Sequence, residues 1–285
     1  MIPSIILHED YQDYLEINIQ ITGKNNQVFL LGNESVKNLE KYPNVEYVDI
    51  SKYVKSKRIE NLKNYFVNYS NYESKYSLFT FVRILIISEF MEDFGFEKVF
   101  SCDSDNILLK DINEYGFTKD SALCIPTVWE PFYFATSVHA ALISKTFCHE
   151  YEKMYEDVFV NKSRLSLFNE KIDFHKTNPG SFCDMTFYHF LNDLDLIEAE
   201  NLLEIKNING KNYVFVNNYA NGEGPKSRNQ YKVNKKGIKI YKNNKLGTNT
   251  IYDNINKEHV NIFNMHYQGK HKQYLKNSLL KKLIY

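Results

Sequence analysis

Short apolar runs separated by polar segments mark the first part of the chain. Residues 2–7 and 27–31 are nearly continuous in apolar side chains, whereas residues 44–50 alternate between apolar and polar positions. Continuous runs of this length are typical of strands buried on both faces of a parallel sheet, and alternation is typical of a strand with one exposed face. These segments therefore predict three strands, the second of which ends at Gly32.

The apolar positions between residues 77 and 94 recur at spacings of three and four. They are Leu78, Phe81, Val82, Leu85, Ile86, Phe90 and Met91. This spacing predicts an amphipathic helix. A further apolar run at 99–102 predicts the next strand, and strands that alternate with helices indicate a parallel α/β sheet. Such sheets bind their ligands at the carboxyl ends of the strands.

The second part of the chain continues this pattern less regularly. Further strands are predicted at 121–126 and 137–144, and the segments 213–219 and 230–241 predict either later strands or a hairpin. Further helices are predicted at 145–160 and 184–194. Gly237 marks a turn within the last strand region. The polar segments 161–179 and 220–228 are predicted loops and candidate lids, although long loops can also contain elements that periodicity does not reveal.

The composition permits a single large α/β domain. Of the 285 residues, 43% are hydrophobic, which is enough for an extensive buried core. The 35 basic and 35 acidic side chains cancel, so the formal net charge is zero. Because a protein that binds nucleic acid normally carries a basic surface, we expect no nucleic acid partner.

The cysteines and the apolar segments indicate the cellular compartment in which we expect the protein. The four cysteines are widely spaced and form no Cys-x-x-Cys pair, which argues against a zinc site or disulfide framework and favours a reducing compartment. The N-terminal apolar run meets acidic residues too early for a signal peptide or membrane span. We therefore expect a soluble, cytoplasmic protein. The tail 275–285 alternates lysines with leucine and isoleucine, which fits either weak peripheral contact with an anionic membrane or a docked terminal helix.

The candidate chemistry begins directly after the strand predicted at 99–102. Asp103 and Asp105 lie two residues apart, and in an extended chain such residues point to the same side. Two carboxylates on one side suit Mg²⁺ or Mn²⁺, which prefer oxygen ligands and leave positions open for substrate phosphates. The same spacing recurs at Asp193 and Asp195 in a polar stretch at a predicted helix end, where solvated acids are the better interpretation.

Two later motifs add residues that suit such a site. His266 offers an imidazole ligand for Mn²⁺, Gly269 lets the backbone approach a phosphate, and Lys272 supplies a cation. Asp184 precedes a predicted helix, where an aspartate suits the N-cap position. Arg83 lies on an otherwise apolar helix face and fits either a phosphate-binding cation or a buried ion pair.

Together these stretches resemble a nucleotide-sugar glycosyltransferase with the GT-A fold, most closely glycosyltransferase family 8. The stretches are Phe81-Val-Arg-Ile-Leu, Val99-Phe-Ser-Cys-Asp-Ser-Asp, Phe182-Cys-Asp-Met, and His266-Tyr-Gln-Gly-Lys-His-Lys. The resemblance implies one domain with a Rossmann-like, mixed, mainly parallel sheet flanked by helices. Residues 1–115 would bind nucleotide and metal, residues 116–260 the acceptor, and residues 261–285 would hold the C-terminal motif and the basic tail.

The resemblance also implies roles for individual residues. The metal, Mn²⁺ or Mg²⁺, would be held by Asp103, Asp105 and His266. The donor, a nucleoside diphosphate sugar carried on uridine diphosphate, would contact His8, Tyr11, Arg83, Ser104, Gly269 and Lys272. Asp184 would be catalytic. The implied reaction transfers a hexose, with retention of configuration, to a glycan or other hydroxyl acceptor.

Other interpretations stay open beside this one. Met185 stands where the family often has Gln, and Gln273-Tyr274 stand where it often has Pro-Trp. The missing amide leaves room for a domain that binds a nucleotide or glycan without turnover. The segment around Asp103 also resembles the nucleophile motif of haloacid dehalogenase-type phosphatases, although that motif normally opens its fold.

Several aromatic side chains have no assigned chemistry. The cluster at 129–133 fits either contact with an acceptor sugar or a place in the core. The histidines without a partner at metal-ligand spacing are interpreted as structural. They are His139, His149, His175 and His189.

Overall fold

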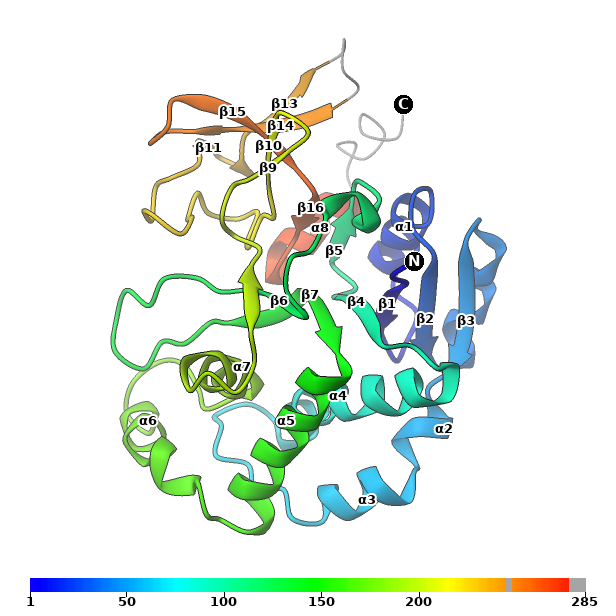
Figure 1. The fold of residues 1–285 in the computed structure, drawn as a ribbon, viewed down its shortest axis with the longest axis vertical. Helices are drawn as coiled ribbons and strands as arrows, with labels where there is room; N and C mark the ends of the chain where they lie inside the picture. The colour runs from blue at the N-terminus through cyan, green and yellow to red at the C-terminus, as the bar shows by residue number, and fades with distance from the viewer. Residues whose placement is uncertain (244–247, 277–285) are drawn as a thin grey trace.

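The computed structural model describes residues 1–243 and 248–276, which form an α/β domain around a seven-stranded sheet (Figure 1). The strand order is β3-β2-β1-β4-β7-β6-β8. The strands are β1 Ser4–Leu7, β2 Val28–Gly32, β3 Val45–Asp49, β4 Lys98–Cys102, β6 Ser121–Cys124, β7 Ser137–Ser144 and β8 Ala199–Asn201. Strands β1 to β4 pair in parallel, as do β6 and β8, whereas β7 is antiparallel to β4 and β6. The predicted mixed, mainly parallel sheet is confirmed.

Alternate residues of the central strands enter two different cores. Ile5 and Leu31 belong to one apolar cluster, and Ile6 and Leu30 belong to another. The first cluster includes residues of α4 Ser74–Phe94, α5 Lys145–Tyr155 and α7 Asp184–Asp193. The second includes residues of α1 Asp13–Thr22 and of the 3-10 helix Glu34–Lys41. Both faces of the central strands are therefore buried, which is what continuous apolar runs predict.

The longest predicted helices are confirmed, but short ones were missed. The helix predicted at 145–160 is α5 followed by a π-helical turn at Glu156–Val160. The loop prediction for 161–179 is wrong, because this segment contains a 3-10 helix, Leu165–Phe168, and α6, Asn169–His175. Elements of one or two turns contain too few residues for a helical period to appear in the sequence.

A second sheet of five strands lies beside the first (Figure 1). In sheet order its strands are β13 Ile240–Asn243, β14 Thr248–Asp253, β15 Glu258–Ile262, β10 Lys211–Val214 and β9 Lys206–Ile208. The strand predicted at 213–219 ends at Val214. The region predicted at 230–241 divides into the hairpin β11 Val233–Asn234 and β12 Gly237–Ile238, followed by β13.

A short antiparallel pair joins the end of β4 to the C-terminal part of the chain. Strand β5, Asn106–Leu108, pairs with β16, Asn264–His266, and the register places His266 opposite Asn106. Because β5 begins at the residue after Asp105, this register brings the C-terminal motif next to the two aspartates.

The predicted lid 220–228 is tied to the loop that follows β6. Thr127 Oγ1 donates a hydrogen bond to the carbonyl oxygen of Pro225 at 2.7 Å, and Trp129 Nε1 donates to Glu223 at 2.6 Å. An ion pair between the same two loops joins Arg228 and Glu130 at 2.8 Å. Such contacts hold the two loops together.

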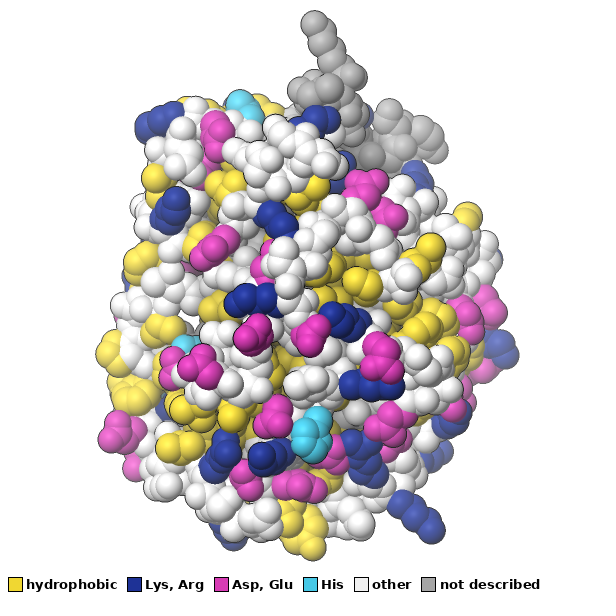
Figure 2. All heavy atoms as spheres, viewed as in Figure 1, with side chains coloured by type: hydrophobic (Ala, Val, Ile, Leu, Met, Phe, Trp, Pro, Cys, Tyr) yellow, Lys and Arg dark blue, Asp and Glu magenta, His cyan; other side chains and the backbone are white. Residues whose placement is uncertain are grey.

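The remaining helices are short. They are α2 Ser51–Val54, α3 Lys57–Lys63, the 3-10 helices Ile112–Tyr115 and Gly269–Lys272, and α8 Gln273–Lys276. Helices α2 and α3 pack against α4, whereas α8 packs against α1. Acidic and basic side chains are interspersed over the face in Figure 2. Within residues 1–243 and 248–276, the helices are too short or too polar to cross a bilayer. Most of the predicted basic tail, residues 277–285, lies outside the described residues.

Candidate metal and donor site

Asp103 and Asp105 are presented by a tight turn. Strand β4 ends at Cys102, and Asn106 N–H then donates to the carbonyl oxygen of Asp103 at 2.9 Å. The extended geometry expected from the sequence is therefore wrong, and the turn brings the carboxylates together instead. From α1, the side-chain amide of Asn18 donates to the carbonyl oxygens of Ser104 at 2.9 Å and Asn106 at 3.0 Å.

Buried amides hold this turn against the neighbouring strands. The Asn106 amide donates to the carbonyl oxygen of His139 on β7 at 2.7 Å, and Asn264 on β16 donates to Asn106 Oδ1 at 2.8 Å. Asn18, Asn106 and Asn264 are each fully buried. The sequence analysis did not identify these asparagines. Asn18 could have been found, because it is a polar residue among the apolar positions of α1, and a buried polar residue is usually hydrogen-bonded.

Asp103, Asp105 and His266 form a compact cluster. One ligand atom from each lies within 4.8 Å of the others. His266 Nδ1 bonds the carbonyl oxygen of Asn217 at 2.5 Å, while Nε2 lies 3.5 Å from Asp105 Oδ1. Histidines that bind metals usually donate the second ring nitrogen in this way, which directs the other toward the metal. Two carboxylates and one imidazole suit Mn²⁺, and also Mg²⁺ with further oxygen ligands.

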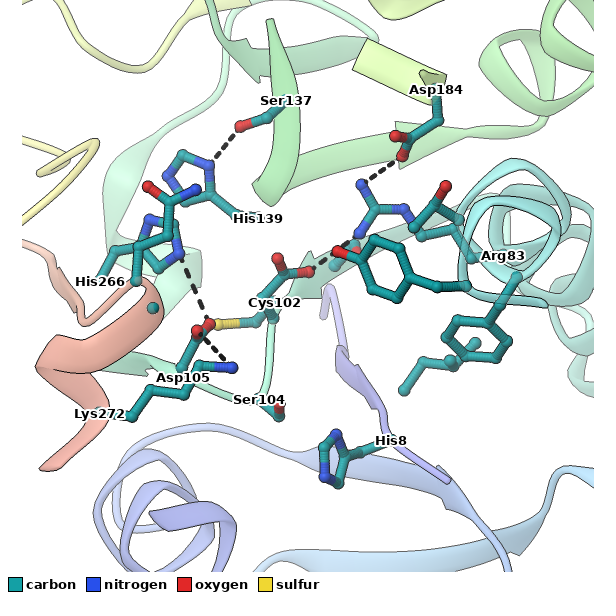
Figure 3. Close-up of a pocket in the computed structure, with 18 of the residues that line it drawn as sticks. His8, Arg83, Cys102, Ser104, Asp105, Ser137, His139, Asp184, His266 and Lys272 are labelled. Carbon is teal, nitrogen blue, oxygen red and sulfur yellow. Dashed lines mark hydrogen bonds and ion pairs between the residues drawn. The ribbon is translucent and has the colours of Figure 1, made fainter. Parts of the chain in front are cut away.

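Asp105 is a buried carboxylate that contacts two basic side chains, His266 and Lys272. Its side chain is 9% exposed, and Lys272 Nζ lies 3.0 Å from its Oδ2 (Figure 3). Burial alone would raise the pKa of Asp105, but His266 and Lys272 hold that pKa below its usual value. Burial would likewise lower the pKa of His266, yet Asp105 raises it. The buried carboxylate of Asp105 is therefore stabilised by the neighbouring His266 and Lys272.

Arg83 joins the metal cluster to Asp184. Its guanidinium donates to Asp103 Oδ1 at 3.2 Å and to Asp184 Oδ2 at 2.7 Å (Figure 3). Tyr188 also donates to Asp184, at 3.0 Å. The N-cap residue of α7 is Cys183, and Asp184 is its first helical residue. The carboxylate of Asp184 therefore contacts Arg83 and Tyr188, and the capping interpretation lacks support.

A cavity of about 750 Å³ surrounds these groups. Of the residues predicted from the sequence, the lining includes His8, Arg83, Asp103, Ser104, Asp105, Asp184, His266, Gly269 and Lys272. Tyr11 is not among the lining residues, because its hydroxyl bonds Glu16 instead. Tyr14, which the sequence did not indicate, lines the cavity near Lys272, whose Nζ lies 4.9 Å from the ring centre.

The cavity lining mixes charged and apolar side chains. His8 is one of the lining residues, and burial and the Lys272 cation lower its pKa. Tyr76, Phe79 and Met185 also line the cavity, and Met185 follows Asp184 in the chain. Trp129, from the aromatic cluster at 129–133, is 39% exposed and is not a lining residue.

His139, which the sequence analysis interprets as structural, is a lining residue next to the metal cluster. Its ring stacks on that of His266, with ring centres 4.1 Å apart and planes 15° apart. Burial, together with the nearby His266 and Arg83, lowers its pKa, which favours a neutral imidazole. The sequence spacing gave no signal, because the contact joins β7 to β16.

Comparison with known proteins supports the fold. No family model and no curated protein matches this chain by sequence. Mouse xyloside xylosyltransferase 1, in its apo form, is similar in structure with a TM-score of 0.50 at 11% identity, over 70% of this chain and 84% of that one. The PaToxG glycosyltransferase has a TM-score of 0.40 at 11% identity, over 68% of this chain and 70% of its own. An active-site mutant of LgtC has a TM-score of 0.40 at 16% identity, over 67% and 70%. The similarity to the xylosyltransferase shows that this chain has the GT-A fold of glycosyltransferases.

Proposed function

We propose that this protein is a metal-dependent glycosyltransferase, akin to family 8, that moves a hexose from a uridine diphosphate sugar to a glycan or other hydroxyl acceptor with retention of configuration. The observation that carries the proposal is the cluster of Asp103, Asp105 and His266, whose ligand atoms lie within 4.8 Å at the carboxyl end of β4. In a GT-A fold, a cluster of this composition suits a metal-bound diphosphate.

Asp103, Asp105 and His266 would hold Mn²⁺ or Mg²⁺. When bound, such an ion supplies charge stabilisation for a leaving diphosphate. The contact of His266 Nδ1 with Asn217 leaves Nε2 directed toward Asp105, so the protein sets this ligand geometry before any ligand arrives. The amide contacts of Asn18 and Asn106 hold the aspartate turn in the same way.

The donor is proposed to lie beside Lys272 and Gly269 in the cavity. Lys272 supplies a cation for the diphosphate, and Gly269, with φ of 59° and open space at its Cβ position, exposes its backbone. His8 and Ser104 line the same cavity and are proposed donor contacts. Tyr11 is a proposed contact with less geometric support, because it lies outside the lining.

Asp184 is the proposed catalytic residue. Its carboxylate lines the cavity, and its hydrogen bonds with Arg83 and Tyr188 fix its direction. A fixed carboxylate at this place can stabilise positive charge at the anomeric carbon or orient the acceptor hydroxyl. Arg83 holds Asp103 and Asp184 at the same time, so it acts on the reaction through both carboxylates.

The acceptor is proposed to enter beside Tyr76, Phe79 and Met185. These side chains and Asp184 line the same cavity. Sugar rings present apolar C–H faces that pack on aromatic and apolar side chains, with polar groups fixing orientation. In this proposal residues 1–115 and the C-terminal motif bind the donor, although Tyr76 and Phe79 of that segment also face the acceptor. Segment 116–260 contributes Asp184 and Met185 to the acceptor side.

The decisive experiment measures release of uridine diphosphate from a panel of nucleotide sugars without acceptor, with Mn²⁺ and with chelator. We expect slow release from one donor with Mn²⁺ and none with chelator. The Asp105→Ala variant should show no metal-dependent release.

Two other results would contradict the proposal. Metal-dependent binding of uridine diphosphate without release from any donor, even with sugar acceptors, would indicate a binding domain. Release of inorganic phosphate from simple phosphate esters, unaffected by His266→Ala, would indicate phosphatase chemistry at Asp103 instead.

A further inference from the structure

His139 meets the candidate metal cluster from the neighbouring strand. It lies on β7, which pairs with β4, and its ring is 3% exposed. Figure 3 shows it next to His266, between Ser137 and the metal cluster. The two rings are nearly parallel, with centres 4.1 Å apart and planes inclined by 15°. Two aromatic rings in this arrangement pack face against face and limit each other's tilt.

His139 is itself held rigidly on both sides. Its Nδ1 forms a hydrogen bond with Ser137 Oγ. Its carbonyl oxygen accepts hydrogen bonds from Asp103 N–H at 2.9 Å and from the Asn106 amide at 2.7 Å. The residue therefore touches the aspartate turn through its backbone and His266 through its ring, which makes the ring a fixed surface.

His266 needs such a surface for its orientation. The bond between Nδ1 and the carbonyl oxygen of Asn217, at 2.5 Å, fixes one edge of the imidazole. A single hydrogen bond of this kind leaves the ring free to tilt about the line between the two atoms. A tilt moves Nε2 out of line with Asp105, and a metal ligand must point its lone pair at the ion. Packing against His139 opposes this tilt.

We propose that His139 is a positioning residue of the metal site, whose flat ring sets the plane of the His266 imidazole. This inference rests on the proposed metal-dependent function. It concerns the shape of the His139 side chain, since its Nε2 is buried without a partner among the described residues. A ring without nitrogens should therefore serve as well, whereas an aliphatic side chain of similar volume should not.

The test measures Mn²⁺ affinity directly, by titration calorimetry in the presence of uridine diphosphate. His139→Leu should weaken Mn²⁺ binding about 10-fold, the lower end of the range for residues that orient metal ligands. His139→Phe should bind Mn²⁺ within about 3-fold of the wild type, because it retains the stacked ring. Thermal unfolding of each variant checks that the fold is retained.

His189 offers a matched control. It stacks on Phe134 with ring centres 4.2 Å apart and planes 8° apart, and it does not line the cavity. His189→Leu removes an equivalent stacked pair away from the metal cluster and should leave Mn²⁺ affinity unchanged. If His139→Leu proves unstable, Ser137→Ala, which frees one edge of the His139 ring, should weaken binding in the same direction by a smaller factor.

Each contrary result has a distinct meaning. Wild-type affinity in His139→Leu, or an equal loss in His139→Phe and His139→Leu, overturns the positioning role while leaving the metal site intact. If Ser137→Ala has to replace an unstable leucine variant, wild-type affinity in Ser137→Ala overturns the role as well. A wild-type protein that binds no Mn²⁺ overturns the proposed function, and this inference falls with it.

Discussion

The chain carries two aspartate pairs of identical spacing in opposite surroundings. Asp103 and Asp105 form a turn at the end of a central strand, where Asp105 is 6% exposed. Asp193 and Asp195 lie at the end of α7, where both are exposed and Asp195 has φ of 52°. The first pair contacts Arg83, His266 and Lys272, and the second is solvated.

Environment, and not spacing, therefore makes an acidic pair a candidate site. Carboxylates taken out of water need compensating charges or hydrogen bonds, and the first pair has them from other segments of the chain. The exposed pair needs no such partners. Substitutions at matched positions in the two pairs should therefore have very unequal effects.

The largest expected effect comes from Asp105→Ala. It should weaken Mn²⁺-dependent binding of uridine diphosphate by more than about 100-fold, beyond the range for residues that merely support a ligand. Titration calorimetry with and without chelator measures this. Asp195→Ala should bind like the wild type. Equal affinities in the two variants would refute the contrast between the pairs.

The two ends of α7 provide the second contrast. Asp184→Asn should lower kcat about 100-fold while donor affinity stays within about 3-fold, because a charge near the reacting carbon is lost but the bonds to Arg83 and Tyr188 can persist. Asp193→Asn, at the exposed end of the same helix, should leave kcat unchanged. Steady-state kinetics with the identified donor separate the two parameters, and a normal kcat in Asp184→Asn would remove it from the catalytic role.

A smaller effect is expected from His266→Ala. It should weaken Mn²⁺ binding about 50-fold, less than the loss of a carboxylate, because water can replace an imidazole while both carboxylates remain. His259→Ala, in the second sheet, is the control and should not change the affinity. If His266→Ala bound Mn²⁺ as tightly as the wild type, the cluster would be reduced to its two aspartates.

The smallest expected effect concerns two lysines, of which one is buried and the other is exposed. Lys171 is 3% exposed, and burial lowers its pKa to about 8. Burial therefore disfavours the charged form of Lys171 in the folded state. The resulting loss in the free energy of unfolding is complete below pH 8, and it disappears as the pH rises toward the pKa of this lysine in the unfolded chain. The free energy of unfolding should rise between pH 7 and 10 by on the order of 2 kcal/mol relative to Lys171→Met.

Lys176 serves as the exposed counterpart, since its side chain is 68% exposed beside Asp173. Lys176→Met should show the same pH dependence as the wild type in denaturant unfolding. A wild-type profile that matches Lys171→Met at every pH would show that Lys171 keeps an ordinary pKa in the folded protein.

Local patterns predicted the strands β1 to β4 and helix α4, because each is long enough for its period to appear. The same reasoning missed α1, whose buried side includes the polar residues Asn18 and Thr22. It also missed α6 inside a predicted loop, and it divided the second sheet incorrectly. These elements are short or mix polar and apolar residues on one face, so their formation depends on what they pack against.

The chemical types at the candidate site can be identified from local sequence: two carboxylates follow a buried strand, and a histidine, a glycine and a lysine lie near the other end of the chain. That these residues meet depends on the folded chain. The pairing of β5 with β16 places His266 opposite Asn106, so that His266 lies beside Asp105 and stacks on the ring of His139. A side-chain hydrogen bond between Asn106 and Asn264, 158 positions apart, holds this pairing. Periodicity encodes which residues face a core, but register between distant strands follows from packing of the whole fold.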